Sequence, residues 1–263
     1  MEHSFSLPTG GTLFVTESHL AVSYDRPRLS LSTAIYGGGF KEICHAVNQK
    51  LTVFYPSESQ FPGGSVSEYL RLSLQEQGYA PEKSCALLTA AKMEWHCKKS
   101  LSYKSLAVDA ITTGGVEKTA ARAGSSPLYE ETDGHFAPVG TINIILSVNA
   151  SLPPGIMARS LITITEGKTA ALQDLGVADV NNGLPATGTG TDGITLITDP
   201  CGPLYTDAGT FSMLGYLLSK AAYDTVRQCL EQYDKPWNRD RSLATPPAAD
   251  LERLKRNRSN GND

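Results

Sequence analysis

The sequence predicts an α/β fold in which a layered mixed sheet is flanked by helices and the N-terminal third is rich in strands. The chain has 263 residues, of which 40% are hydrophobic and 19% charged, and this composition is typical of a globular protein with one large core. Short β-branched segments between Gly and Pro fill the first third, whereas strand-like and helix-like segments alternate from residue 84 onward. No repeat or change of composition interrupts residues 1–233, which we therefore treat as a single domain.

The N-terminal third is expected to form three short strands before its first helix. Alternating or β-branched segments at 11–16, 20–24 and 29–36 predict these strands, and Gly or Pro residues separate them. A helix is expected over about 66–77, because either Ser65 or Ser67 can cap its start and Gly78 can end it.

The remaining two thirds predict alternating strands and helices. Strands are expected at 84–89, 105–112, 141–148 and 194–197. A short helical run is expected between Gly115 and Ala123. The longest helix is expected to begin at Pro153 and Pro154 and to end near Leu175, and the last helix spans 212–232 with Ser212 as its cap.

Composition and charge restrict the class of protein. The net charge of −4 gives no indication of nucleic-acid binding. Residues 234–263 are rich in Pro, Ala and basic side chains, so we expect a disordered basic C-terminal tail. Five scattered cysteines favour a reducing compartment, and neither a signal peptide nor an apolar run of about 20 residues is present, so a cytoplasmic protein without a membrane span is expected. The histidine spacing indicates no metal site.

The run 186–192 is the most informative segment. Thr187, Thr189 and Thr191 alternate with Gly188 and Gly190, and Asp192 precedes a predicted strand. Glycines let a ligand approach backbone N–H groups, and a carboxylate at the mouth of a strand can act as an acid or base. A flexible turn leading into the strand explains the same pattern equally well.

Two further polar groups are expected at strand ends, where ligands collect in α/β sheets. Thr112, Thr113, Gly114 and Gly115 follow a strand and precede the short helical run, so their N–H groups could bind an anion or oxyanion. No phosphate-loop or dinucleotide fingerprint accompanies them, and a tight structural turn is the competing interpretation. Asn143 and Asn149 form the second group.

The long helix has two faces. Its core face is predicted from apolar residues at three- and four-residue steps, namely Met157, Leu161, Ile164, Ala171 and Leu175. The opposite face carries Arg159, Thr163, Glu166 and Gln173. This polar face is either a solvated surface or one wall of a cleft to which Glu166 contributes a carboxylate.

Several of these segments together resemble the adenosylcobinamide amidohydrolase family. The resemblance covers about residues 28–230. It is carried by 108–117, 120–124, 140–146, 161–175 and 186–193, together with 32–39 and Asn48. Glu117 and the Tyr36-Gly37 pair depart from the family pattern, which bears on the detailed substrate rather than on the reaction class.

The resemblance implies hydrolysis of the amide that joins aminopropanol to a corrin propionate in adenosylcobinamide, a step of corrinoid salvage that yields adenosylcobyric acid. The partner is then a small-molecule corrinoid, its cobalt belongs to the substrate, and no tightly bound cofactor or metal is expected. A non-catalytic corrinoid-binding protein and an amidase for an unrelated amide are the alternatives.

Chemistry suggests which residues would perform such a hydrolysis, because the reaction needs a nucleophile, oxyanion donors and a proton for the amine. Our hypothesis is a water activated by Asp192 or Glu166, with either Thr189 or Thr191 as the alternative nucleophile. The expected oxyanion donors are the N–H groups of Gly188, Gly190 or Gly114. The expected substrate-binding residues are Thr112, Thr113, Gly114, Gly115, Asn143, Gly188, Gly190, Gly38 and Asn48.

Overall fold

A computed structural model describes residues 3–116, 119–126 and 140–232. The tail predicted for 234–263 lies outside the described residues. The strands of the N-terminal part are β1 (His3–Ser6), β2 (Thr12–Val15), β3 (His19–Ser32), β4 (Gly39–Lys50) and β5 (Ser84–Thr89). Helix α1 (Val66–Glu76) precedes β5, and three short 3-10 turns lie at Glu58–Gln60, Pro81–Lys83 and Met93–Trp95.

The C-terminal part holds four strands and two long helices among its described residues. They are β6 (Cys97–Tyr103), β7 (Leu106–Gly115), β8 (Thr141–Val148), α2 (Pro154–Asp174), β9 (Gly193–Thr198) and α3 (Met213–Glu231). The strands form one sheet in the order β1-β2-β3-β9-β8-β7-β6, and β4 pairs with both β3 and β5. The β4–β5 and β8–β9 pairs are parallel and the other pairs antiparallel, which confirms the mixed α/β sheet.

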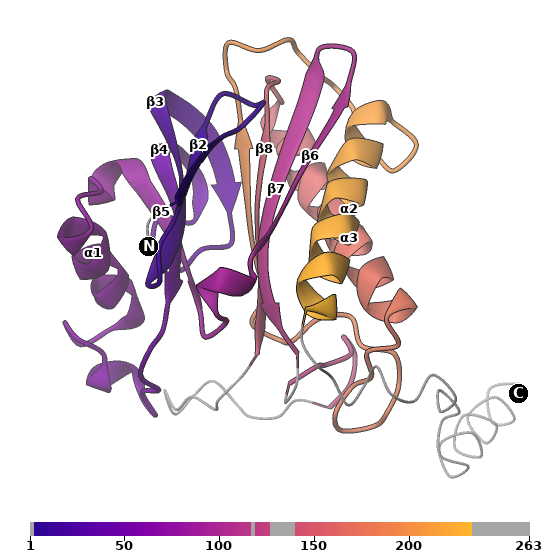
Figure 1. Cartoon of the computed structure of the whole chain (residues 1–263). Helices are drawn as coiled ribbons and strands as arrows, with labels where there is room; N and C mark the ends of the chain where they lie inside the picture. The colour runs from indigo at the N-terminus through magenta and orange to yellow at the C-terminus, as the bar shows by residue number, and fades with distance from the viewer. Residues whose placement is uncertain (1–2, 117–118, 127–139, 233–263) are drawn as a thin grey trace, which may run out of the picture.

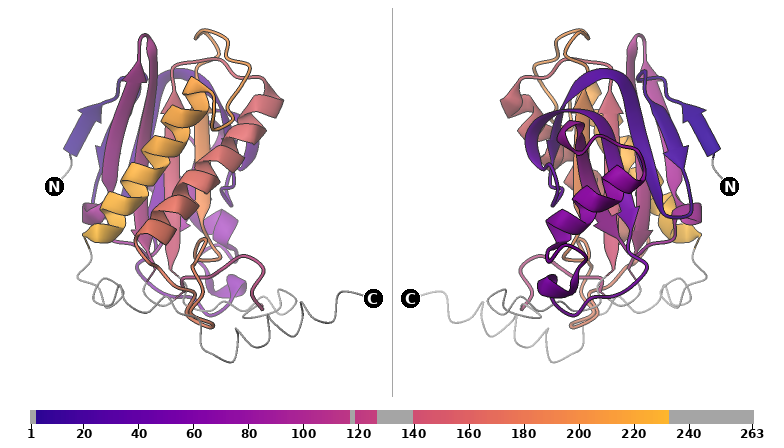
Figure 2. Two further views of the ribbon diagram at one scale, coloured as in Figure 1. Left: turned by 90° about the vertical axis from the view of Figure 1, so that its right-hand side faces the viewer. Right: turned by 90° about the vertical axis from the view of Figure 1, so that its left-hand side faces the viewer.

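The sheet curls so that its β2–β5 part lies against its β7–β9 part, and helices cover the two outer faces (Figure 1). The inner core contains Leu20, Ile43, Leu87, Ile111 and Ile145. Figure 2 shows α2 and α3 side by side over one face and α1 over the opposite face.

The apolar residues that pack under the helices on the two outer faces alternate along their strands with a period of two residues. Ile142, Ile144 and Leu146 of β8 point toward α2 and α3, whereas Ile145 between them points to the inner core. Ala21, Val47 and Ala86 face α1 on the other side of the molecule.

Helix boundaries agree with the capping residues that the sequence offers. The side chain of Ser65 accepts a hydrogen bond from the Glu68 N–H at the start of α1, and Ser212 accepts one from the Gly215 N–H at the start of α3. Gly78, with φ of 82°, lies just past the end of α1. Both predicted caps are therefore confirmed.

Other local expectations were wrong. The strand predicted at 20–24 and the first half of the one predicted at 29–36 belong to one long strand, β3, which ends at Ser32 and whose register with β4 shifts between Ser23 and Arg28. This irregularity accommodates Pro27, which cannot donate a ladder hydrogen bond. Strands β1, β4 and β6 were not predicted, because their exposed polar residues hide the alternation.

A further error concerns the polar group that follows the third strand. Strand β7 continues through Gly114 and Gly115, which pair with Ile142 and Thr141 of β8, so no strand-to-helix turn begins there. Residues 119–126 contain no helix. On α2, Thr163 is buried and its hydroxyl donates to the Ala208 carbonyl, so the predicted polar face is not continuous.

We expect Gly167 to be essential for the packing of α2 on α3. A Cβ at this position would lie 2.4 Å from the Ser219 carbonyl oxygen. Gly167→Ala should therefore lower the free energy of unfolding in urea by about 1–3 kcal/mol, the usual cost of overpacking. The control is Gly155→Ala near the start of the same helix, where a Cβ meets open space and stability should hold or rise. Equal stability of both variants would contradict the prediction.

His45 predicts a pH dependence of stability. The ring lies opposite Ser23, with 2.9 Å between Nδ1 and the Ser23 hydroxyl. Burial, and then the charge of Lys83, lowers the pKa of His45 below 6.5, so on acidification the unfolded chain takes up this proton first. Stability should therefore fall as the pH drops below 6.5, and His45→Gln should reduce this dependence in urea titrations. An unchanged pH profile in the variant would contradict the assignment.

Candidate active site

Most of the predicted site residues gather where β8 and β9 begin and where β4 and β7 end. Asn143 is the third residue of β8 and pairs with Gly193, the first residue of β9. Because β8 and β9 are parallel, the polar residues lie at the amino ends of this pair, and the expectation of strand carboxyl ends was wrong for them.

The polar residues at the starts of β8 and β9 form what we call the polar edge, and Asp192 lies at its centre. One carboxylate oxygen, Oδ1, accepts from the Thr189 hydroxyl at 2.5 Å and from the Ile142 N–H at 3.0 Å. The other, Oδ2, accepts from the Thr189 N–H at 3.3 Å and forms an ion pair with Lys168. A carboxylate offers about four acceptor positions, so all of them are engaged. The Asp192 side chain is 11% exposed.

Lys168 of α2 was not predicted as a site residue. Its side chain is 8% exposed, and its ammonium group is the counter-charge of Asp192. Its helical spacing nevertheless indicates burial. Lys168 lies four residues after Ile164 and three before Ala171, so it falls on the predicted core face of the helix. A lysine on a core face needs a buried partner, and Asp192 is that partner.

The glycines of the run 186–192 have different roles. Gly188 lies between the charged partners, because a Cβ there would approach Asp192 Oδ2 at 2.4 Å and Lys168 Nζ at 2.9 Å. Its N–H donates to the Ala121 carbonyl, so it is not a free oxyanion donor. Gly190 is exposed and has a φ of 86°, a conformation that favours glycine. Its N–H therefore remains a candidate donor.

Three further predicted residues, Asn48, Thr113 and Asn143, meet between the two parts of the sheet. The Asn48 amide donates to the Thr113 hydroxyl at 2.8 Å, and the Asn143 amide donates to Asn48 Oδ1 at 2.8 Å. All three are at most 2% exposed. Gly193 is adjacent, since a Cβ there would lie 2.7 Å from Asn143 Oδ1. The structure thus brings these residues next to Asp192, but as a buried support with satisfied hydrogen bonds.

Thr191 and Thr141 complete the polar edge. Their hydroxyls are 2.8 Å apart, and the Thr191 hydroxyl also contacts the Gly140 carbonyl at 2.8 Å. Thr191 is exposed, whereas Thr189 is only 3% exposed. The run therefore passes from the surface at Gly190 and Thr191 into the interior at Thr189.

The remaining predicted residues lie elsewhere. The Thr112 hydroxyl donates to Thr225 of α3, on the face of β7 opposite Thr113. Gly114 lies within β7 and pairs with Ile142 of β8, and a Cβ there would lie 3.3 Å from Leu230 of α3. Gly38 belongs to the tight turn between β3 and β4, where a Cβ would meet the Ala34 carbonyl at 2.2 Å.

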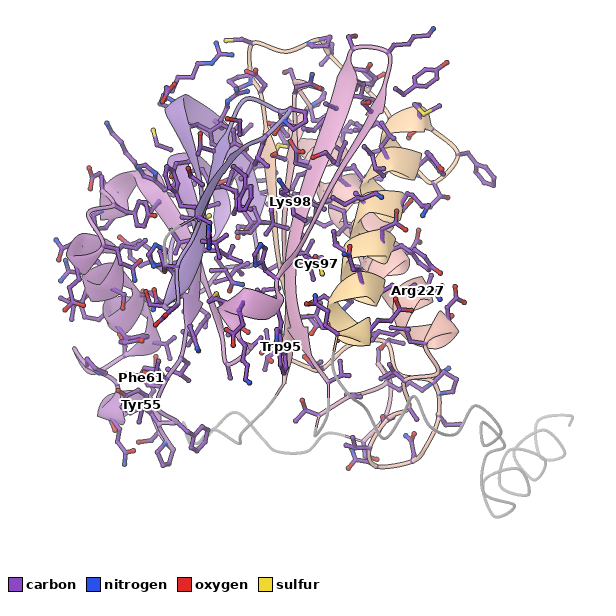
Figure 3. All side chains as sticks on the ribbon, in the orientation of Figure 1. Tyr55, Phe61, Trp95, Cys97, Lys98 and Arg227 are labelled. Carbon is purple, nitrogen blue, oxygen red and sulfur yellow. The ribbon has the colours of Figure 1, made fainter. Side chains whose placement is uncertain are left out.

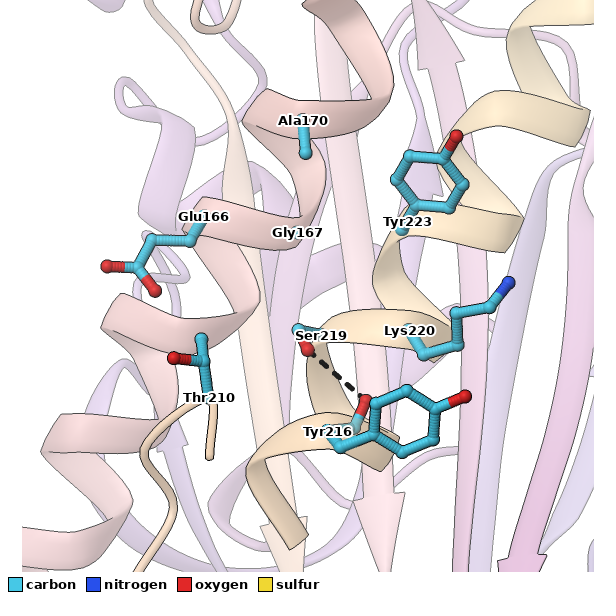
Figure 4. Close-up of a pocket in the computed structure, with 8 residues that line it drawn as sticks. All are labelled: Glu166, Gly167, Ala170, Thr210, Tyr216, Ser219, Lys220 and Tyr223. Carbon is cyan, nitrogen blue, oxygen red and sulfur yellow. Dashed lines mark hydrogen bonds between the residues drawn. The ribbon is translucent and has the colours of Figure 1, made fainter. Parts of the chain in front are cut away.

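Glu166 is not part of the edge around Asp192. It is exposed on α2 and lines a surface groove between α2 and α3 with Gly167, Lys220 and Tyr223 (Figure 4). Glu166 and Lys168 are two residues apart and therefore point to different sides of the helix. Of the two carboxylates proposed as bases, Asp192 lies at the polar edge and Glu166 does not.

The buried Cys85 thiol is not an alternative nucleophile. Burial raises the pKa of the Cys85 thiol to about 11, so this thiol stays protonated and poorly nucleophilic at neutral pH. Within 3–116, 119–126 and 140–232, no group of three or more His, Cys, Asp or Glu side chains could hold a metal ion. Across the same residues, no helix is long and apolar enough to span a membrane.

Thr189, Asp192 and Lys168 are joined by a chain of polar contacts. A hydroxyl is hydrogen-bonded to a carboxylate, and that carboxylate is held in place by an ammonium group. This is the order of nucleophile, base and orienting group on which acyl transfer relies.

Comparison with known proteins gives the class and then the family. A family model described as adenosylcobinamide amidohydrolase matches residues 5–237, nearly all of the domain. The protein is therefore a hydrolase that acts on amides. It belongs to the adenosylcobinamide amidohydrolase family.

A relative and several solved structures are similar to this chain. An uncharacterized protein of Methanocaldococcus jannaschii is 32% identical over 231 residues, which cover 82% of this chain and 87% of the relative. The PH0078 protein of Pyrococcus horikoshii OT3 has a TM-score of 0.45 at 13% identity, over 98% of this chain and 91% of that one. The L-aminopeptidase D-Ala-esterase/amidase of Ochrobactrum anthropi, described as a variant of the Ntn hydrolase fold, has a TM-score of 0.41 at 7% identity, over 90% of each chain.

The ion pair between Lys168 and Asp192 should contribute to stability through charge compensation. Lys168→Met leaves the Asp192 carboxylate buried without its counter-charge and should lower the free energy of unfolding by about 3–5 kcal/mol. The double variant Lys168→Met/Asp192→Asn removes both charges and should be the more stable of the two in urea unfolding.

The control for this prediction is Lys220→Met. Lys220 pairs with Asp224 on the surface of α3, where the two side chains are 41% and 22% exposed. Loss of such a pair should cost less than about 1 kcal/mol. A similar loss for Lys168→Met and Lys220→Met would contradict the assignment.

Proposed function

We propose that this protein hydrolyses the amide between aminopropanol and the corrin propionate of adenosylcobinamide, releasing adenosylcobyric acid and aminopropanol. Membership of the family supports the reaction. The hydroxyl of Thr189, 2.5 Å from Asp192 Oδ1, is the observation that supports a site for it. The cobalt is part of the substrate, and we propose no tightly bound cofactor. The five free cysteines favour a reducing cytoplasm as the location of this salvage step.

Thr189 is the nucleophile of the proposed reaction. A threonine hydroxyl is weak without a base, and the contact with Asp192 supplies one. A water activated by Asp192 is less compatible with this geometry, because the water would have to displace one of four existing hydrogen-bond donors.

The first half of the reaction forms an ester on the protein. The Thr189 oxygen attacks the amide carbon while its proton passes to Asp192. When the C–N bond breaks, this proton leaves with the aminopropanol nitrogen, and the corrin propionate remains esterified to Thr189. Lys168, paired with Asp192, stabilises the anionic carboxylate.

The second half releases the acid. A water attacks the ester carbon and gives its proton to Asp192. The bond to Thr189 then breaks, the threonine oxygen regains the proton, and adenosylcobyric acid departs. The N–H of Gly190, exposed at the edge, is the proposed donor to the oxyanion in both halves.

Substitution of Thr189 tests this proposal. Thr189→Val should lower kcat/KM for adenosylcobinamide by about 10³-fold or more, because no hydroxyl remains to attack, whereas Thr189→Ser should keep much of the activity. Asp192→Asn should lower it by about 10²–10⁴-fold, the usual contribution of a general base. Released aminopropanol is the measured product, and mass spectrometry of the stopped reaction should detect the ester.

The matched control is Thr187→Val in the same run. The Thr187 hydroxyl accepts from the Ala123 N–H at 2.8 Å and does not contact Asp192 in this structure, so turnover should change little. Full activity of Thr189→Val with a strong loss in Asp192→Asn would instead favour the water mechanism, and a strong loss in Thr191→Val alone would favour Thr191. Corrinoid binding by the wild-type protein without aminopropanol release would overturn the hydrolase proposal in favour of a binding protein.

A further inference from the structure

An exposed apolar pair lies at the same end of the molecule as the polar edge. Val53 is 56% and Phe54 44% exposed, although both follow directly on a strand of the core. One further backbone hydrogen bond continues the pairing with β5 beyond the end of β4: the Leu51 N–H donates to the Thr89 carbonyl at 2.7 Å. This hydrogen bond therefore fixes the backbone two residues before Val53.

The segment that carries this pair is anchored on its other side as well. Tyr55, Phe61 and Tyr69 pack together, with ring centroids 4.4 Å apart for Tyr55–Phe61 and 5.6 Å for Phe61–Tyr69. Phe61 is buried, and Tyr69 belongs to α1. Figure 3 shows Tyr55 and Phe61 at the lower end of the molecule. Two apolar side chains held outward between two anchors form a preorganised surface.

The pair is linked to the candidate active site through β4. Asn48, five residues before Val53, donates to Thr113 and accepts from Asn143. Asn143 also donates to the Leu88 carbonyl of β5 at 2.9 Å, and its strand partner is Gly193, next to Asp192. The ends of β4 and β5 thus lie beside the strand starts that carry the polar edge.

A bulky substrate must leave most of its surface outside the site. Thr189 is 3% exposed, so in the proposed reaction only the amide-bearing arm would enter the site, and the wide macrocycle would lie on neighbouring surface. A corrin ring is large and largely apolar, and burying an aromatic side chain against it is favourable. We propose that Val53 and Phe54 form the surface on which the corrin macrocycle rests while its propionate arm enters the site. This inference rests on the proposed function.

Replacement of both side chains tests the proposal. The variant Val53→Ser/Phe54→Ser should raise the Kd for adenosylcobyric acid, measured by equilibrium dialysis, by about tenfold. It should lower kcat/KM for adenosylcobinamide by a similar factor. For N-(2-hydroxypropyl)propanamide, which carries the amide without the ring, kcat/KM should be unchanged. Phe54→Leu, which keeps an apolar side chain, should restore part of the affinity.

The matched control is Phe211→Ser. Phe211 is the most exposed large hydrophobic residue in the described part of the chain, at 107%, and lies two residues before α3. Helix α3 begins at the upper end of the molecule (Figure 1), whereas Tyr55 and Phe61 lie at its lower end (Figure 3). Its replacement should leave the Kd unchanged. Equal affinities in wild type and the double variant would overturn the proposal, as would equal losses in the double variant and Phe211→Ser, or a wild type that does not bind adenosylcobyric acid.

The dialysis also separates this inference from the proposed function. A wild-type protein that binds adenosylcobyric acid through Val53 and Phe54 but releases no aminopropanol would contradict the hydrolysis and support the surface. Hydrolysis of adenosylcobinamide with the same kcat/KM in wild type and the double variant would support the hydrolysis and contradict the proposed surface. A dimer that the double variant dissociates, with corrinoid affinity unchanged, would assign the pair to a second copy of the chain and overturn the proposal.

Discussion

The ion pair between Lys168 and Asp192 is the interaction on which the candidate site depends. It joins α2 to the residue before β9, and the same carboxylate accepts from Ile142 of β8 and from Thr189. A buried charge is tolerated only when it is paired and hydrogen-bonded, so each of these contacts constrains the others. The requirement for glycine at 188 follows, because a side chain there would separate the two charges.

Much of the fold could be predicted where a local signal was complete. Strand β8 is buried along its whole length and was predicted with its observed bounds, and Ser65 and Ser212 marked the starts of their helices. Strand β7 was predicted too short, because Gly114 and Gly115 were interpreted as a turn. In the structure the missing side chain of Gly114 instead admits Leu230 of α3, a contact that only the tertiary fold reveals.

The candidate site was predictable in its residues more than in its arrangement. Asn48, Thr113 and Asn143 were each identified, yet their mutual hydrogen bonds join residues up to 95 positions apart, and no local pattern encodes such pairs. Lys168 was missed although its position on the core face of α2 indicated a buried charge. Glu166 was selected as the carboxylate of the predicted polar face of α2, and the helical period places it on a different side from Lys168, where it lines the groove between α2 and α3.

The burial of Thr189 connects the chemistry with the size of the substrate. The Thr189 residue is 3% exposed and so is shielded from bulk water, and this strengthens the interaction of its hydroxyl with the Asp192 carboxylate. The proposed reaction therefore requires that an extended arm of the substrate reach Thr189 while the ring system stays outside. Selectivity for the proposed corrinoid substrate would then arise on the surface outside the reacting groups. Binding energy gained there can hold the arm in place for attack, which is the way remote contacts contribute to the rate rather than to affinity alone.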